Sequence, residues 1–215
     1  MLRFFNRLTI AGILFILFSI GIFIFTLRNV IILFTPAVDL YASTDWSELD
    51  EGTHVSTKLD FIYDYFYYVY DEDTNVEQSR AYMIPNLVED ESGIHIKEYV
   101  GVMVNLSEGY EPYDNAVDKS RDWWYMLDEN AEFPEPSIEL DGYLRKMKKD
   151  EKEFLVEYIS GDFGISEQEA EAYVCPYMVM PYDSGNARSM MIISAALFGL
   201  GLLFAGIGIL IGLKR

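Results

Sequence analysis

The sequence is poor in cysteine and histidine, the residues that most often build disulfide frameworks, metal centres and nucleophilic sites. Its 215 residues include one cysteine, Cys175, and two histidines, His54 and His95. A single cysteine excludes an internal disulfide, and we interpret Cys175 as a small buried hydrophobe. A lone histidine in a strand-like segment is more often a surface or core residue than a base, so neither histidine is assigned a catalytic role.

The chain also lacks the short motifs that carry recognisable chemistry. It contains no G-x-S-x-G or S-x-x-K nucleophile motif, no C-x-x-C, no H-E-x-x-H and no glycine-rich phosphate loop. We therefore predict no catalytic, cofactor-binding or metal-binding residue, and we expect the protein to be non-enzymatic and to need no cofactor.

One acidic stretch has the alternating oxygen ligands of a calcium loop. Asp71, Asp73 and Asn75 alternate and are followed by Glu77. The stretch departs from the EF-hand pattern, because Val76 stands where the turn glycine belongs and Tyr82 where the bidentate glutamate belongs. An acidic hairpin tip explains Asp71–Glu77 as well, so the sequence leaves calcium binding open.

Acidic residues are absent from both ends of the chain. All 35 of them lie in residues 29–189 with 11 of the 16 basic residues, which gives that segment a net charge of −24. Such a domain repels nucleic acid, so we predict no nucleic-acid partner. The charge is interpreted mainly as a solubilising surface, with a cation-binding or basic-partner surface as the alternative.

Two long apolar runs dominate the ends. Met190–Leu213 has no charge over 24 residues, and Leu8–Leu27 has none over 20, each enough to cross a bilayer core of ~30 Å. The first run is too long for a signal-peptide core and lacks an A-x-A cleavage site. We predict a tail at 1–7, transmembrane helices at 8–34 and 190–213, a domain at 35–189 and a tail at 214–215.

Basic residues flank the outer ends of both runs. Arg3 and Arg7 precede the first run, and Lys214 and Arg215 follow the second. Because Lys and Arg in short flanks mark the cytoplasmic side, we expect a multi-pass plasma-membrane protein with both termini cytoplasmic and the central domain extracytoplasmic.

The second run carries small residues four apart, a spacing that lets helices approach closely. The pairs are Ala195 with Gly199, Gly201 with Ala205, and Gly208 with Gly212. Three interpretations stay open: the two helices pack on each other, the second one mediates association with itself or with another membrane protein, or the spacing reflects the general enrichment of glycine in membrane helices. The lipid bilayer is the remaining expected partner.

The central domain is predicted to be α+β, a mostly antiparallel sheet with three or so helices, beside the two transmembrane helices. Ile94–Asn105 alternates, placing Ile94, Ile96, Val100, Val102 and Val104 on one face. The other predicted strands are His54–Leu59, Phe61–Tyr70, Arg80–Val88, Ser137–Met147 and Tyr177–Tyr182. The predicted helices are Glu111–Asn130, one from the box Asp150-x-x-Glu153 to a cap at Gly161, and one from Ser166-x-x-Glu169 to Pro176.

Aromatic residues are the remaining candidates for a binding surface. The run Phe61–Tyr70 carries aromatics on both strand faces, so one face could be a platform for a glycan or an extended peptide. Cross-strand packing in a sheet covered by helices on one side is the alternative. Trp123 and Trp124 are adjacent on a predicted helix, so one could face outward, and Trp46 is a candidate for an interfacial belt.

Several short sequence segments give the chain a resemblance to a known protein family. They are Gly52-x-His54-Val55, Ala81–Ile84, Tyr99–Val102, Asp141–Leu144, and Ser166–Val174 leading into Pro176-Tyr177. With the order of elements, they resemble uncharacterised two-pass membrane proteins of Gram-positive bacteria, which carry a domain of unknown function between two transmembrane helices. The resemblance implies no activity and no catalytic residue.

These observations predict a non-enzymatic, membrane-anchored extracytoplasmic module that binds a ligand or takes part in complex assembly. The alternative is an extracytoplasmic hydrolase acting on envelope or peptide substrate. That alternative requires a pocket that gathers His54 or His95 with carboxylates.

Overall fold

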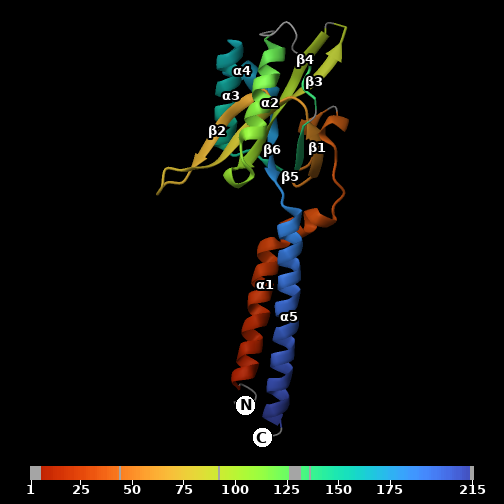
Figure 1. The fold of residues 1–215 in the computed structure, drawn as a ribbon, viewed down its shortest axis with the longest axis vertical. Coiled ribbons are helices and arrows are strands. Elements are labelled where there is room, and N and C mark those ends of the chain that lie inside the picture. Colours follow the sequence, from red (N-terminus) through yellow and green to blue (C-terminus); the bar gives the residue numbers. More distant parts are fainter. Residues whose placement is uncertain (1–5, 44, 92, 126–131, 136, 214–215) are drawn as a thin grey trace. The chain divides into compact units, whose positions relative to one another are not determined.

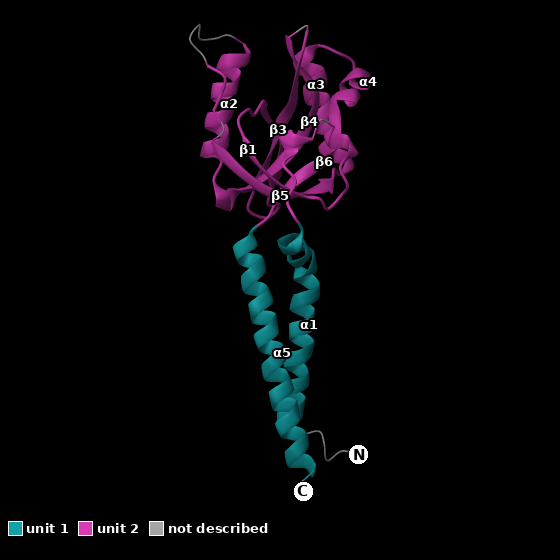
Figure 2. Cartoon of the chain, turned by 90° about the vertical axis from the view of Figure 1, so that its right-hand side faces the viewer, with its two compact units in different colours: residues 1–35, 183–215 teal, residues 36–182 magenta. Residues whose placement is uncertain are grey.

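A computed structural model describes residues 6–43, 45–91, 93–125, 132–135 and 137–213. The chain divides into two compact units, Met1–Thr35 with Asp183–Arg215, and Pro36–Tyr182, drawn in two colours in Figure 2. Each unit is described by itself.

The first unit is a hairpin of two apolar helices, α1 (Arg7–Phe34) and α5 (Ser184–Leu213). At 28 and 30 residues, both are long and apolar enough to cross a membrane. The side chain of Asn6 caps α1 by accepting a hydrogen bond from the backbone of Thr9. The second helix begins ahead of Met190, because the Asp183 carboxylate accepts a hydrogen bond from the backbone N–H of Asn186 in its first turn.

The two helices are antiparallel and pack through small residues. Ser194, Gly201 and Gly208 of α5 are buried at seven-residue intervals, opposite Ser19, Gly12 and Thr9 of α1. A seven-residue repeat is typical of a left-handed helix pair. The Ser19 hydroxyl donates to the Ser194 carbonyl at 2.8 Å, and the Ser194 hydroxyl donates to the Ser19 carbonyl at 3.0 Å. The predicted packing of the two helices on each other is therefore present.

The second unit contains a six-stranded mixed sheet in the order β1-β5-β6-β4-β3-β2 (Figure 1). Its neighbours are antiparallel except β4 and β6, which are parallel. The strands are β1 (His54–Leu59), β2 (Asp64–Tyr70), β3 (Glu77–Asp90), β4 (Gly93–Asn105), β5 (Ile138–Lys146) and β6 (Val174–Pro181). The predicted α+β fold with a mostly antiparallel sheet is confirmed.

Helices cover both faces of this sheet, not one. On one face, α2 (Glu111–Trp124) packs with the short 3-10 helices η2 (Leu40–Ala42) and η3 (Trp46–Glu48). On the other face lie α3 (Lys149–Phe163), α4 (Glu167–Ala170) and the 3-10 turn η5 (Glu171–Tyr173). Figure 2 shows α2 and the α3–α4 pair on opposite sides of the strands. Trp46 is 1% exposed in the core, so its predicted place in an interfacial belt is wrong.

Several predicted boundaries shift for identifiable reasons. The first helix of the α3–α4 pair is capped by Glu151, whose carboxylate accepts from the backbone N–H of Lys148, so the predicted box at Asp150 is wrong. That helix continues past Gly161 and ends at Gly164, which adopts the left-handed φ of 63° that a C-cap requires.

The predicted box at Ser166 is confirmed, but α4 is one turn long and Pro176 lies inside β6. The predicted end of α2 at Asn130 lies outside the described residues.

The alternation predicted for β4 breaks at one position. Val100, Val102 and Val104 pack in the α2-side core, as predicted, but Ile96 packs in the α3-side core and Ile94 is exposed. The register shifts at Lys97, because Asn86 pairs with Glu98 and the next residue, Leu87, pairs with Ile96. This extra residue reverses the two faces, as a β-bulge does.

Candidate functional site

A cavity of about 390 Å³ lies on the α3 side of the sheet, at the Gly93 end of β4. Its aliphatic walls are four isoleucines: Ile94, Ile96, Ile159 and Ile165. Its aromatic walls are Tyr99, Trp124, Phe163 and Tyr173, and His95 is the remaining lining residue. The volume falls at the lower end of the range of small-molecule sites, and mostly apolar walls with few polar groups are typical of such sites.

The lining residues come from four separate segments of the chain, which the fold brings together. One wall is β4, a second is the end of α2 and a third is the last turn of α3 with the residues that follow it. The fourth segment is η5, which contributes Tyr173. After Gly164, the chain folds back, and the backbone N–H of Ile165 donates to the Ser160 carbonyl while the Ser160 hydroxyl donates to the Ile165 carbonyl. That turn holds Phe163 and Ile165 at the cavity.

A tyrosine–carboxylate cluster lies behind the aromatic wall. The Tyr63 ring contacts the rings of Tyr99, Trp124 and Phe163 at centroid distances of 5.6, 6.0 and 5.8 Å. Its hydroxyl donates to Asp162 at 2.5 Å, and the Tyr125 hydroxyl donates to the same carboxylate at 3.2 Å. Asp162 is therefore held beside the cavity by two phenols.

Burial affects the pKa of two phenols near the cavity, Tyr63 and Tyr99. It raises the pKa of Tyr63, with the hydrogen bond to Asp162 as the second cause. Burial also raises the pKa of Tyr99, and the negative charge of Asp162 adds to that shift. These tyrosines therefore remain hydroxyl donors at physiological pH and do not supply a phenolate base.

The two histidines do not share a site. His54 lies on β1, where its Nε2 is 2.7 Å from Oδ1 of Asp141, and His95 lies on β4, where its Nδ1 is 3.5 Å from Oδ2 of Asp90. Two strands, β5 and β6, separate β1 from β4, which places the histidines at least about 14 Å apart at ~4.8 Å per strand. Only His95 reaches the cavity.

The acidic stretch 71–77 forms a hairpin turn. The Asp71 carboxylate accepts hydrogen bonds from the backbone of Asp73 and from both the backbone and the hydroxyl of Thr74. The Thr74 hydroxyl is the largest cause of the lowered pKa of Asp71. Among the described residues, no three His, Cys, Asp or Glu side chains gather as metal ligands. These contacts are those of an acidic hairpin tip, the second of the two interpretations of this stretch.

Cys175 is buried, as the sequence predicts. Its side chain is fully enclosed in the α2-side core, and burial raises the pKa of its thiol to about 12. A protonated, enclosed thiol is a weak nucleophile.

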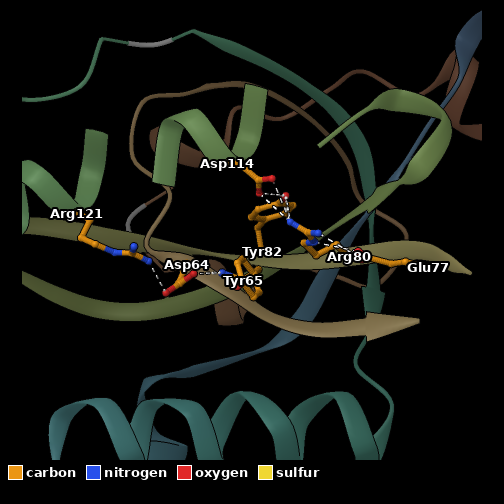
Figure 3. Close-up of polar contacts among 7 residues, drawn as sticks. All are labelled: Asp64, Tyr65, Glu77, Arg80, Tyr82, Asp114 and Arg121. Atoms are coloured by element: carbon orange, nitrogen blue, oxygen red, sulfur yellow. Dashed lines mark hydrogen bonds and ion pairs between the residues drawn. The ribbon is translucent and has the colours of Figure 1, made fainter. Parts of the chain in front are cut away.

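The exposed face of the aromatic run packs on one arginine. The Arg80 guanidinium lies 4.4 Å from the Tyr110 ring centroid and 5.0 and 5.6 Å from those of Tyr65 and Tyr68. Figure 3 shows the same guanidinium held between Glu77 and Asp114, at 2.9 Å from each, with the Tyr82 hydroxyl also on Asp114. Tyr65 and Tyr68 are thus engaged within the domain, which favours packing over a free platform.

Replacing Arg80 with lysine is expected to lower the free energy of unfolding by about 1–2 kcal/mol, because an ammonium cannot stack on three rings and bind two carboxylates together. Arg121→Lys is the matched control, since Arg121 is more exposed than Arg80 and its ion pair with a described residue is with one carboxylate, Asp64, at 3.1 Å (Figure 3). We expect it to cost under about 0.5 kcal/mol. Urea unfolding of the full chain measures both, and equal losses would contradict the proposed stacking.

Comparison with known proteins gives one result at the level of family. Residues 2–212, nearly the whole chain, match a family described as a domain of unknown function, DUF8577. No curated protein matches the chain, and no solved structure does. The match covers both apolar helices and the domain between them. The chain therefore belongs to the DUF8577 family, whose function is not known.

Proposed function

We propose that this protein is a two-pass plasma-membrane protein with cytoplasmic termini and an extracytoplasmic, non-enzymatic binding domain. Two apolar helices flank one domain, and the basic residues near each chain end favour the cytoplasmic side for both termini. The resemblance to two-pass proteins of Gram-positive bacteria supports the same location.

We also propose that α5 associates with a further transmembrane helix, because Ala195 and Gly199 remain exposed after α1 has packed on Gly201 and Gly208.

One observation carries the binding role, the cavity beside β4. Its described lining residues are apolar or aromatic apart from His95, and none is a serine, threonine or cysteine. Such a site supplies contact area and, among its described lining residues, no serine, threonine or cysteine nucleophile. Ligand binding therefore has more support than covalent catalysis.

The hydrolase alternative has one observation in its favour, since His95 lines the cavity next to Asp90. With no serine, threonine or cysteine among the described lining residues, such an enzyme would activate water through His95. A His95→Ala variant separates the two roles, because it removes the base from a hydrolase and leaves the apolar walls of a binding site.

Cysteine labelling in intact cells tests the topology. Glu72 is exposed in the β2–β3 turn, whereas Ser43, whose hydroxyl donates to the Asp45 carbonyl, is half-buried and a poorer reporter. We expect a membrane-impermeant maleimide to label Glu72→Cys in intact cells, and to reach Cys175 only after denaturation. A cysteine appended after Arg215 is the cytoplasmic control. Protection of Glu72→Cys until the membrane is permeabilised would reverse the proposed orientation.

A further inference from the structure

The cavity beside β4 has aromatic walls, and its described lining contains no lysine or arginine. Four of its nine lining side chains are aromatic and four are isoleucine, with no lysine or arginine among those described. Faces of aromatic rings attract cations through their quadrupole, and indole rings do so most strongly. An apolar body packed on the isoleucines and a positive charge over the rings would both be accommodated.

Carboxylates lie next to these walls. Asp162 is held by the hydroxyls of Tyr63 and Tyr125 directly behind the aromatic wall, and its charge acts on Tyr99. Asp90 lies 3.5 Å from His95 at the mouth. The segment 29–189 as a whole has a net charge of −24, so its field favours cations near the cavity and repels anions.

The mouth of the cavity is apolar as well. Ile94 is 47% exposed, and Phe163 and Tyr173 are each 40% exposed. Clustered exposed apolar side chains around a concave site mark an interaction site more often than single exposed ones do. The volume of about 390 Å³ lies within the range of small-molecule sites, so we take the occupant to be a small molecule.

We propose that this cavity binds a small organic cation, an amine or ammonium joined to an aromatic or branched apolar body. This inference rests on the proposed binding role and names the ligand class of the same site. The isoleucines bury the apolar body, the rings of Trp124, Phe163 and Tyr173 face the cation, and Asp162 supplies the neighbouring negative charge.

Three probes that share one ring system test the charge preference. Tryptamine is cationic, indole is neutral and indole-3-acetate is anionic. Each is titrated against the full chain in phosphatidylcholine nanodiscs by saturation-transfer NMR, with empty nanodiscs as the blank. We expect tryptamine to bind about tenfold more tightly than indole-3-acetate, with indole between them. Equal affinities, the reverse order, or no saturable binding of tryptamine would overturn the proposal.

Two phenylalanines on one helix locate the binding site. Phe163 lines the cavity and Phe154, 48% exposed on the same helix, instead contacts Tyr67 at a ring centroid distance of 5.4 Å. Phe163→Leu is expected to weaken tryptamine binding about three- to fivefold, and Phe154→Leu to leave it unchanged. An equal loss in both variants would show that the probe binds elsewhere, and would refute the site.

Two substitutions of opposite charge at the mouth of the cavity test the electrostatic part of the proposal. Because Ile94 is half-exposed, both Ile94→Lys and Ile94→Glu are expected to fold. Lysine should weaken tryptamine binding about threefold or more, and glutamate should strengthen it. The same direction of change in both variants would refute the charge argument.

The cysteine labelling described above tests the membrane topology, and its result does not depend on these titrations. Failure of the proposed ligand class and failure of the proposed topology are therefore distinguishable.

Discussion

Replacing Gly12 with leucine is expected to separate α1 from α5. A Cβ atom built at Gly12 would lie 2.4 Å from the backbone nitrogen of Ala205 and 2.6 Å from the carbonyl oxygen of Gly201. These are backbone atoms of a helix, so no side-chain rotation can relieve the overlap. Overpacking by a single methyl group costs about 1–3 kcal/mol, and a leucine adds three more carbons.

The pair Ser19→Cys and Ser194→Cys reports the separation. The two hydroxyl oxygens lie 3.3 Å apart, so the replacing sulfurs are within reach of a disulfide after a small shift. In a Cys175→Ala background, oxidation should consume both thiols, as counted by alkylation and mass spectrometry. Gly12→Leu should reduce disulfide formation about tenfold, the effect of ~1.4 kcal/mol.

Gly21→Leu is the matched control, because it lies on the same helix and nothing comes within 4 Å of a Cβ built there. Disulfide formation should be unchanged in this variant. If both leucine variants retained the disulfide, the close contact at Gly12 would be contradicted. If both lost it, leucine would be disrupting α1 independently of packing.

Hydropathy predicted the two helices but not the way they pack. The apolar runs required helices, and their lengths set the ends to within a few residues except at the start of α5. The predicted small pairs are four residues apart, and one of them, Gly208 with Gly212, is buried at both positions. The other buried positions of α5 are Ala187, Ser194 and Gly201, which precede Gly208 at seven-residue intervals. Ser194 takes a place in this row beside the glycines because its hydroxyl and that of Ser19 each donate to the other residue's backbone carbonyl.

The strands of the domain were predictable because alternation and β-branched residues depend on local sequence. Which face each residue occupies was less predictable, since one bulge at Lys97 reverses the pattern of β4. Helices on both faces of the sheet depend on α2 and α3 packing from far apart in the chain, and no local pattern encodes that choice. The cap at Glu151 departs from the capping-box sequence pattern, because a lysine, Lys148, stands at the N-cap position where that pattern requires serine or threonine.

The cavity was not predictable from the sequence for a related reason. Its lining comes from four segments between residues 94 and 173, and only Trp124 and His95 had been considered as binding or catalytic candidates. An isoleucine that lines a cavity and one that fills a core have the same signature in a sequence. Only the packing of β4 against the last turn of α3 distinguishes them.

One buried carboxylate could have been found and was missed. Glu98 shares its alternation with Val100, Val102 and Val104, so it was bound to point into an apolar core. It is 4% exposed and joins η3 to the sheet, since it accepts the backbone N–H of Trp46 at 2.7 Å, the Ser47 hydroxyl at 2.6 Å and the Asn86 amide at 3.2 Å. A buried charge requires such partners.

Replacing Glu98 with alanine is expected to destabilise the domain by about 3 kcal/mol, because it removes the carboxylate that accepts from the buried Trp46 N–H, the buried Asn86 amide and the exposed Ser47 hydroxyl. For a chain of this size, the midpoint of thermal unfolding should fall by roughly 10 °C. Glu98→Gln keeps one acceptor oxygen and the shape of the side chain, so its loss should be about half as large. Fluorescence of the buried Trp46 in the full chain follows the transition, with the other tryptophans contributing to the signal.

Glu89→Ala is the control for this substitution, since Glu89 is an exposed carboxylate on the adjacent strand. It is expected to change the midpoint by no more than about 2 °C. A similar small change for Glu98→Ala would mean that Trp46 and η3 are held by apolar packing alone. A large loss for alanine with partial retention for glutamine would show that the carboxylate oxygens fix η3, and with it the Trp46 side of the core, to the sheet.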